Sequence, residues 1–207
     1  MIKNLTILRE EQYKNLANLS LNGKVLDLGG SRKSGYQKIP KGNYKVTIAN
    51  INPAHGCDMV FDIDKKFPIK DREYGYVICL NVLEHIFNFE NVFRETYRVL
   101  KKNGTFIFSL PFMHHIHGSP NDYFRLTKSA LEKILKENNF KKAKIKSIGF
   151  GLFSLIFQTT LDIYPLFLRG PIKRFFTSLD KTLLAGSSRY KRFKNRIPLG
   201  YFVIAKK

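Results

Sequence analysis

The sequence predicts an α/β domain built around a largely parallel β-sheet. Short apolar runs typical of strands recur along the chain, and amphipathic helical patterns separate several of the later runs. A chain of 207 residues can bury one good core, and no internal repeat or low-complexity tract divides it. We therefore expect a single domain over residues 1–207, with a doubly wound arrangement of its strands.

Apolar runs of strand length mark the expected strands, which are 24–28, 44–49, 59–61, 75–80, 104–110, 143–149 and 200–205. Apolar residues at helical spacing predict helices over 6–19, 88–101 and 127–138. The last of these helices opens with Thr127, a residue type that favours the N-cap position. Strands and helices thus alternate along most of the chain.

Residues 150–197 depart from this alternation. The run 150–168 is nearly uncharged, but Asp162 and Pro165 interrupt it, and a transmembrane helix needs about 20 mainly apolar residues. A helical face follows, made of Ile172, Phe175, Phe176, Leu179 and Leu183, and then the basic segment "SSRYKRFKNR". Such a helical excursion fits two roles: covering the domain's own sheet, or lying on an anionic membrane or an acceptor.

The net charge of +20 favours anionic partners, such as nucleic acid, an acidic membrane surface or a phosphorylated substrate. From Leu126 onward the chain has 18 Lys and Arg residues against four acids, so most of the excess lies there. Cys57 and Cys79 have no metal-ligand neighbour at short spacing and are expected to be reduced, buried thiols. The first 15 residues hold no apolar signal-peptide core. We expect a cytoplasmic protein, peripheral on the inner face of the cell membrane if the basic segment binds lipid.

The stretch "VLDLGGSRKSGYQ" at 25–37 predicts a strand that enters a nucleotide-binding loop. Gly30 and Gly35 have the spacing of a P-loop, but Tyr36 and Gln37 follow where that loop needs Lys and Ser or Thr. The loop therefore does not suit a triphosphate. In a dinucleotide fold an acid for the ribose hydroxyls stands about 20 residues further on, and Asn50 is found there.

Four segments in order carry a family resemblance: "VLDLGGS", "NINP", "DMVFDIDKKFPIKDREYGYVICLNVLEHI" and "FRETYRVLKKNGTFIFSLPF". Together they resemble the class I S-adenosylmethionine-dependent methyltransferases of the type 11 subgroup, over about residues 20–150 and the closing strand "GYFVIAKK". The resemblance implies an enzyme with S-adenosylmethionine as cofactor. It also implies a Rossmann-like, doubly wound, seven-stranded sheet, mostly parallel with an antiparallel last strand and helices on both faces.

The resemblance implies a cofactor site at the ends of the first four strands. Its residues would be Asp27, Gly29, Gly30, Ser31, Asn50, Ile51, Asp62, Ile63 and Asn81. Of these, Asp27 to Ser31 would wrap the methionine and ribose, Asp62 would accept from the adenine amine, and Asn81 would lie near the methionine end. Ser31 and Lys33 replace glycines of the family, and Asn50 replaces an acid, so we expect weaker cofactor binding than in typical members.

The stretch "SLPFMHHIHGSPNDYFRLT" at 109–127 leaves the fifth expected strand and is rich in polar side chains. A hydroxyl acceptor benefits from a general base, which is typically His or a carboxylate. The expected catalytic residues are His117 and Asp122, with His85 behind them. The expected substrate-binding residues are His114, His115, Tyr123 and Arg125. No metal site is expected, because the segment lacks Cys and further His ligands.

The segment "HGSPNDYFRLT" is similar to one in type 11 members associated with surface-glycan and lipid-linked-sugar assembly. It implies O-methylation of a sugar or another hydroxyl acceptor, carried on a lipid at the membrane face. An RNA methyltransferase is the first alternative; the charge favours it, but no "NPPY"-type loop and no RNA-binding module are present. A catalytically weak pseudo-methyltransferase that serves as a membrane-associated partner is the second.

Overall fold

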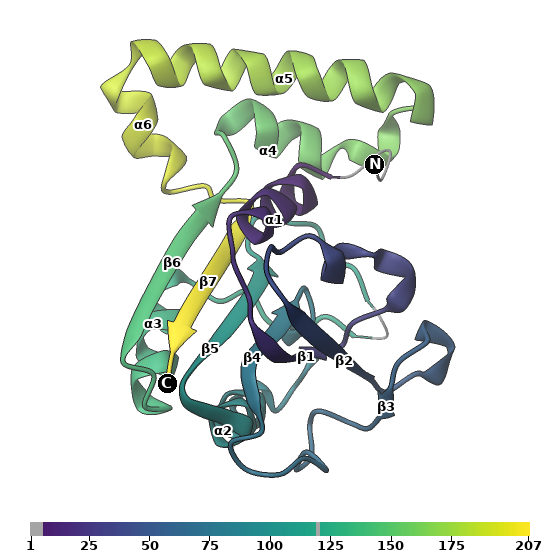
Figure 1. The fold of residues 1–207 in the computed structure, drawn as a ribbon. Helices are drawn as coiled ribbons and strands as arrows, with labels where there is room; N and C mark the ends of the chain where they lie inside the picture. The colour runs from purple at the N-terminus through teal and green to yellow at the C-terminus, as the bar shows by residue number, and fades with distance from the viewer. Residues whose placement is uncertain (1–5, 119–120) are drawn as a thin grey trace.

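The computed structural model describes residues 6–118 and 121–207, and its centre is a seven-stranded sheet in the order β3-β2-β1-β4-β5-β7-β6 (Figure 1). The strands are β1 (Gly23–Leu28), β2 (Tyr44–Asn50), β3 (Met59–Val60), β4 (Tyr74–Leu80), β5 (Leu100–Pro111), β6 (Lys142–Ile148) and β7 (Gly200–Lys206). β7 pairs antiparallel with β5 and β6, while the pairs from β3 to β5 are parallel. The predicted fold class is confirmed, and so is each expected strand.

β5 begins earlier than the sequence predicted, because its irregular start pairs with the start of β4. Leu100 pairs with Tyr74, and the register then shifts before Thr105 pairs with Tyr76. Asn103 has a φ of 63° inside this irregularity. Asn adopts the left-handed region more readily than most residues, which suits it to this place.

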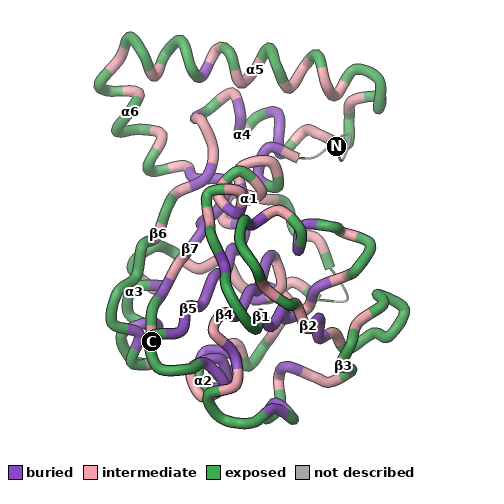
Figure 2. Tube along the Cα trace, viewed as in Figure 1, coloured by how far each residue is buried: buried purple, intermediate pink, exposed green. Residues whose placement is uncertain are grey.

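Helices cover both faces of the sheet. On one face lie α2 (Phe89–Val99) and α3 (Lys128–Glu137), whose apolar sides join the larger core cluster. On the other face lie α1 (Ile7–Ala17) and α4 (Leu152–Thr159), which join the second cluster. Thr127 accepts a hydrogen bond from the Ala130 backbone N–H, so the predicted N-cap of α3 is confirmed. The buried residues follow the strands and the inner sides of these helices (Figure 2).

The order in which the chain adds strands to the sheet reverses between β1 and β4, and ligands bind at such a point in sheets of this kind. From β1 the chain continues outward through β2 and β3, then returns to β4 on the other side of β1. The carboxyl ends of β1 and β4 therefore open onto a topological switch point. After β1 the chain forms two short 3₁₀ turns, Arg32–Ser34 and Tyr36–Lys38, in place of a full helix.

Between β6 and β7 the chain forms α4, then α5 (Leu166–Gly186) and α6 (Ser188–Lys194). α5 packs on α4 and is the outermost helix of the molecule in Figure 1. The expected apolar face of this region divides: Ile172 and Phe176 pack on the second core cluster, while Phe175 and Leu183 are exposed.

A buried carboxylate connects the three helices α4, α5 and α6 between β6 and β7. Asp180, on α5, accepts hydrogen bonds from the Phe153 and Ser154 backbone N–H groups at the start of α4 and from the Tyr190 hydroxyl on α6. A carboxylate at a helix N-terminus satisfies donors that have no partner inside the helix. Among the described residues, no helix combines the length and the apolar character that crossing a membrane requires.

Candidate functional site

A cleft of about 790 Å³ lies at the carboxyl ends of β1, β2 and β4. This size falls within the usual range for small-molecule sites. The main cleft, as we call it, contains ten of the predicted site residues: Gly29, Ser31, Asn50, Ile51, Asp62, Ile63, Asn81, His85, His117 and Tyr123. The switch point thus brings together residues that lie almost one hundred positions apart in the sequence.

Two glycines at the end of β1 allow the backbone to pass close to neighbouring groups. Gly29 has a φ of +70°, and a Cβ there would lie 2.5 Å from the nearest Val82 side-chain carbon. A Cβ on Gly30 would lie 2.1 Å from an Asp27 carboxylate oxygen. Gly30 is buried and does not line the main cleft. These glycines let the β1 loop pack against both its own strand and the segment that follows β4.

Asp27 does not face the main cleft, although the sequence placed it at the cofactor. Its side chain is fully buried and accepts hydrogen bonds from the Tyr36 hydroxyl at 2.8 and 2.9 Å and from Gln37 Nε2 at 2.8 Å. Burial raises the pKa of Asp27 to about 7, while these hydrogen bonds act in the opposite direction. Its observed role is to hold the loop that follows β1, and Tyr36 and Gln37 are its partners.

Asn50 links two loops at the rim of the main cleft. Its Nδ2 donates to the Gly30 carbonyl at 2.9 Å, and its Oδ1 accepts from the Asn52 backbone N–H at 3.0 Å. A side-chain amide has a second N–H and a second lone pair, so Asn50 retains capacity to bind a ligand. Asp62 accepts from the Asp64 backbone N–H at 2.9 Å in a local turn and also lines the cleft.

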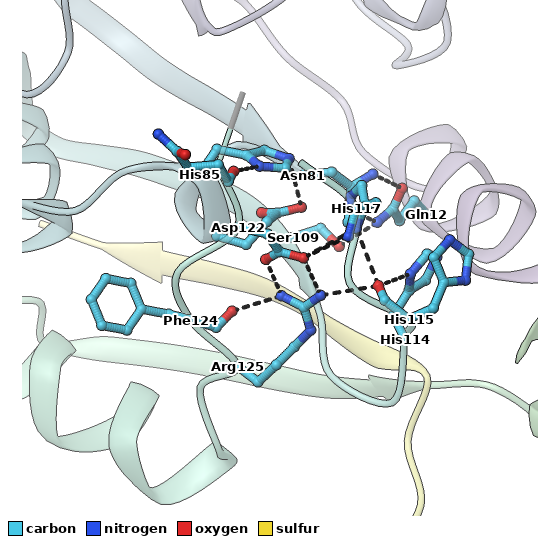
Figure 3. Close-up of polar contacts among 12 residues, drawn as sticks. Gln12, Asn81, His85, Ser109, His114, His115, His117, Asp122, Phe124 and Arg125 are labelled. Atoms are coloured by element: carbon cyan, nitrogen blue, oxygen red, sulfur yellow. Dashed lines mark hydrogen bonds and ion pairs between the residues drawn. The ribbon is translucent and has the colours of Figure 1, made fainter. Parts of the chain in front are cut away.

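Asn81 directly follows β4 and adopts the left-handed region, with a φ of 54°. Gln12 Nε2 donates to Asn81 Oδ1 at 2.6 Å, and Asn81 Nδ2 donates back to Gln12 Oε1 at 3.0 Å (Figure 3). Gln12 also donates to Ser109 Oγ at 2.8 Å. An unusual backbone conformation that its surroundings fix is typical of functional sites. Sequence reasoning missed Gln12 and the cleft-lining Arg9 because both lie on α1, which no motif connects to the site.

The main cleft suits S-adenosylmethionine in both its volume and the chemistry of its lining. Apolar side chains line it beside the amides and carboxylates, as a flat adenine with polar edges requires; they are Ile51, Phe61, Ile63, Val82 and Ile86. Ile51 lies at the rim and is 67% exposed, so its side chain is available to a bound ligand. Asn50 and Asp62 would hold the ribose and adenine, and Asn81 the methionine end.

On the acceptor side, His85 and His117 lie next to each other at one end of the main cleft, with ring centroids 5.1 Å apart. His85 Nδ1 lies 2.6 Å from the Asn121 carbonyl oxygen. His117 Nδ1 lies 3.4 Å from the His115 carbonyl oxygen. Burial lowers the pKa of His117, so the neutral imidazole predominates at neutral pH.

Asp122 does not present its carboxylate to the main cleft. Arg125 donates to both of its oxygens at 2.5 Å, and the His117 backbone N–H donates to it at 3.0 Å (Figure 3). The side chain is 2% exposed, and the hydrogen bonds from Arg125 hold the pKa of Asp122 well below its usual range. Asp122 and Arg125 form an ion pair within the acceptor loop, and neither lines the main cleft. The sequence had predicted a catalytic role for Asp122 and a substrate-binding role for Arg125.

The remaining predicted substrate residues lie at different places. Tyr123 lines the main cleft and is 44% exposed. His114 lines a smaller side cavity of about 250 Å³, which shares Arg9, Asn81 and His117 with the main cleft. The ring of His115 contacts His114 but lines neither cavity. Ser119 and Pro120 of the same segment lie outside the described residues.

Glu84 is the main residue that sequence reasoning overlooked, although its neighbour His85 was chosen. It lines the side cavity and is completely buried, and neither carboxylate oxygen accepts a hydrogen bond from any residue that the structure describes. Burial raises the pKa of Glu84 to about 8. A buried carboxylate without a hydrogen-bond partner is costly and therefore marks a site worth explaining.

Comparison with known proteins gives one family match. Residues 19–108 match the profile of the type 11 methyltransferase domain. A search of curated protein sequences finds no match. The family profile ends within β5, so it covers the cofactor side of the main cleft and Glu84 with His85, but not the acceptor loop.

Solved structures share the fold at low sequence identity. An S-adenosylmethionine-dependent methyltransferase from Archaeoglobus fulgidus has 17% identity and a TM-score of 0.60, with 97% of this chain and 92% of that one covered. Phosphoethanolamine N-methyltransferase 2 from Haemonchus contortus, in complex with S-adenosyl-L-methionine, has 16% identity and a TM-score of 0.59. That alignment covers 96% of this chain and 51% of the other, so this chain spans about half of that enzyme's length.

The family match and the fold lead to one coarse conclusion. The match over residues 19–108 and the shared fold support an enzyme, a methyltransferase that uses S-adenosylmethionine as its cofactor. The identity of the methyl acceptor does not follow from them, because the acceptor loop lies outside the matched residues.

Proposed function

We propose that the enzyme methylates a hydroxyl oxygen on a sugar or a similar polyol, and that the acceptor is carried on a lipid at an anionic membrane surface. The observation that carries the proposal is the group of Glu84, His85 and His117 where the main cleft meets the side cavity. We call this group the inner cluster.

S-adenosylmethionine supplies an electrophilic methyl group bound to a sulfonium sulfur. A neutral hydroxyl is a weak nucleophile, so its proton has to leave as the new bond forms. The inner cluster offers the imidazoles of His85 and His117 for that purpose, whereas an amine acceptor that is already neutral needs no such help. Holding the acceptor in line is the other large contribution, worth about 7–11 kcal/mol in well-oriented systems.

The side cavity favours a polar acceptor. Its walls include Arg9, Asn81 and His114, which together offer several hydrogen-bond donors. A molecule rich in hydroxyl groups can satisfy these donors, while an apolar one would leave them without partners. The cavity of about 250 Å³ holds a small ring more readily than an extended polymer.

The α5 and α6 region supports the lipid-borne form of the acceptor. Exposed apolar side chains gather at the start and middle of α5: Leu166, Phe167, Leu168 and Phe175. Exposed basic side chains follow on the same helices: Arg174, Lys181, Arg189, Lys191 and Arg192. Apolar side chains flanked by Lys and Arg suit an interface of acyl chains and anionic headgroups.

Transfer of labelled methyl from S-adenosylmethionine into fractionated lipid, polysaccharide and RNA pools tests the acceptor class. We expect alkali-stable label in the lipid-linked sugar fraction. His117→Ala should slow transfer while cofactor binding, measured by calorimetry, stays near the wild-type value. Label in RNA alone would replace this proposal with the RNA methyltransferase that the net charge of +20 first suggested.

Co-sedimentation with vesicles tests the membrane part. We expect the full chain to pellet with anionic vesicles at low salt and much less with neutral ones. The double variant Phe167→Ser with Phe175→Ser should pellet less than wild type. Val60→Ser removes an apolar side chain of β3 that is 57% exposed, against 78% for Phe167 and 62% for Phe175, and serves as the control. Equal pelleting of all three proteins would remove α5 as the contact surface.

A further inference from the structure

We propose that Glu84, His85 and His117 bind a divalent transition-metal ion at the junction of the main cleft and the side cavity. One ligand atom from each of the three side chains lies within 4.8 Å of the other two. Two imidazoles and one carboxylate are a recurrent ligand set for such ions, and they leave coordination positions open for other molecules. The sequence analysis expected no metal, because the segment 109–127 lacks Cys and further His ligands; the ligand set proposed here adds Glu84 and His85 from outside that segment.

Glu84 provides the observation that points to a ligand. Its carboxylate lies fully inside the protein, yet no hydrogen bond reaches either oxygen from the described residues. Its nearest basic atom is His85 Nε2, 3.8 Å from Oε1. The positive charge of a bound ion would compensate a carboxylate that the protein itself leaves without hydrogen bonds.

Both histidines are oriented as metal ligands usually are. His85 Nδ1 faces the Asn121 carbonyl oxygen at 2.6 Å, and since a carbonyl can only accept, Nδ1 carries the proton in the neutral ring. His117 Nδ1 lies 3.4 Å from the His115 carbonyl oxygen and 3.4 Å from Asp122 Oδ2. Each ring thus keeps its Nε2 lone pair for an ion, with an oxygen acceptor behind it as a second shell.

The required rearrangement is small. Ligands about 2.1 Å from a zinc ion lie about 3 to 3.5 Å from one another in tetrahedral geometry. The 3.8 Å separation between Glu84 and His85 is close to that value, and the widest separation has to shrink by roughly 1 Å, which side-chain rotation supplies. Arg125 lies nearby but is neutralised by its two hydrogen bonds to Asp122.

The inference deepens the proposed function and rests on it in one respect. An acceptor hydroxyl bound at an open position of the ion would lose its proton to solvent water more readily, because the ion stabilises the alkoxide. His117 would then act as a ligand and not as the proton acceptor. Metal binding itself does not depend on the identity of the acceptor, so it can be tested alone.

Isothermal titration of Zn²⁺ into the full chain, without a purification tag and after chelator treatment, tests the site. We expect one equivalent to bind with a dissociation constant in the micromolar range or tighter. Glu84→Gln and His85→Asn each remove a ligand and should weaken binding by at least about 10- to 100-fold, the loss that is usual for an outer-shell partner of a ligand. Zn²⁺ should raise the melting temperature of wild type and leave that of Glu84→Gln nearly unchanged.

A matched control separates this site from the neighbouring surface histidines. His115→Ala removes an exposed imidazole next to His114 and His117 and should leave zinc affinity within twofold of wild type. Glu84→Gln places a neutral side chain of the same shape in a buried position, so a folded variant is expected, and its circular dichroism confirms that. Loss of binding in His115→Ala with retention in Glu84→Gln would overturn the proposal, as would no saturable binding at millimolar Zn²⁺.

The same titrations distinguish the two proposals. If zinc binds as expected but no hydroxyl-bearing lipid accepts label, the metal site stands and the acceptor proposal fails. If transfer to a lipid-linked sugar is observed in chelator-treated protein that shows no zinc binding, the acceptor proposal stands and His117 returns to the role of proton acceptor.

Discussion

Gln12 and Asn81 exchange two hydrogen bonds across the face of the sheet, at 2.6 and 3.0 Å, although 69 residues separate them in the chain. Gln12 is on α1 and is almost completely buried, while Asn81 directly follows β4 and has a positive φ. The pair thus joins the first helix to the strand end that lines the main cleft. It fixes the direction of the Asn81 amide from outside the segment matched to the methyltransferase family.

Replacing Gln12 with Ala should therefore damage the cofactor site from a distance. Asn81 and Ser109 would each lose a buried partner, and we expect the free energy of unfolding to fall by about 1–3 kcal/mol. Affinity for S-adenosylmethionine should fall several-fold, as calorimetry would measure. Lys14→Ala, an exposed change on the same helix, is the control. Unchanged affinity in a folded Gln12→Ala protein would show that Asn81 needs no support from α1.

The sequence was sufficient for the sheet because apolar runs and their alternation with helices carry that information directly. The residues at the end of β4 could also be predicted from the sequence, since "LNVLEHI" follows an apolar strand and places Asn81 and His85 at its carboxyl end. The contacts made by α1 could not be predicted from the sequence. Gln12 and Arg9 reach the site only through the packing of α1 on the sheet, and packing between distant elements leaves no local pattern.

Asp27, Asp122 and Glu84 show the same limit for carboxylates. Sequence position alone does not distinguish a carboxylate that faces a ligand from one that accepts hydrogen bonds inside the protein. The carboxylate of Asp27 accepts hydrogen bonds from Tyr36 and Gln37, and that of Asp122 accepts them from Arg125. The carboxylate of Glu84 accepts none from the described residues. The partners decide the role, and they lie on other turns or loops.

The raised pKa of Asp27 predicts a pH-dependent stability. A carboxyl whose pKa rises from 3.8 to about 7 on folding binds its proton more tightly in the folded state. The stability that it contributes is complete below the unfolded pKa and is lost as the pH rises through about 7. Between pH 5 and pH 8 wild type should lose about 2 to 3 kcal/mol relative to Asp27→Asn, measured by urea unfolding.

Asn suits this comparison because it has the shape of a neutral carboxyl and never ionises. Its amide can accept from Gln37 and donate to the Tyr36 hydroxyl, so the hydrogen bonds at the β1 loop persist. Other titrating groups are common to both proteins and cancel in the difference. Parallel stability curves for wild type and Asp27→Asn over this pH range would mean that Asp27 is ionised in the folded protein throughout.

The contacts of Asn50 lead us to expect that Asn50→Asp does not improve cofactor binding, although the family pattern suggests that it would. Restoring the usual acid with Asn50→Asp would offer a charged acceptor to the ribose hydroxyls. In this fold, however, Asn50 Nδ2 donates to the Gly30 carbonyl at 2.9 Å, and a carboxylate there would place oxygen against oxygen. We expect Asn50→Asp to lower the free energy of unfolding by about 1–2 kcal/mol and to leave S-adenosylmethionine affinity equal or weaker.

The control for Asn50→Asp is a variant that keeps the amide N–H donor but has a longer side chain. Asn50→Gln retains an amide N–H but moves it by one methylene, so it separates the need for a donor from the need for its position. Calorimetric titration of S-adenosylhomocysteine into the three proteins gives the comparison. A tenfold gain in affinity for Asn50→Asp would instead mean that the loop rearranges and that the Gly30 contact is dispensable.

From the ion pair of Asp122 and Arg125 we expect that its loss slows methyl transfer without weakening cofactor binding. Arg125→Ala removes both donors to the Asp122 carboxylate, and the remaining carboxylate, which also accepts from the His117 backbone N–H, stays buried without its counterion. We expect the free energy of unfolding to fall by about 2 kcal/mol, the methyl-transfer rate to fall at least tenfold, and cofactor affinity to change little.

The physical reason for this separation is that the ion pair holds the backbone of His117, whereas the cleft-lining residues at the ends of β1, β2 and β4, where we expect the cofactor, lie on other segments. Arg125→Lys keeps the charge but cannot form the paired contact, so it should recover only part of the stability and the rate. Single-turnover transfer and calorimetry measure the two effects independently. If Arg125→Ala weakens cofactor binding as much as it slows transfer, the acceptor loop also forms part of the cofactor site.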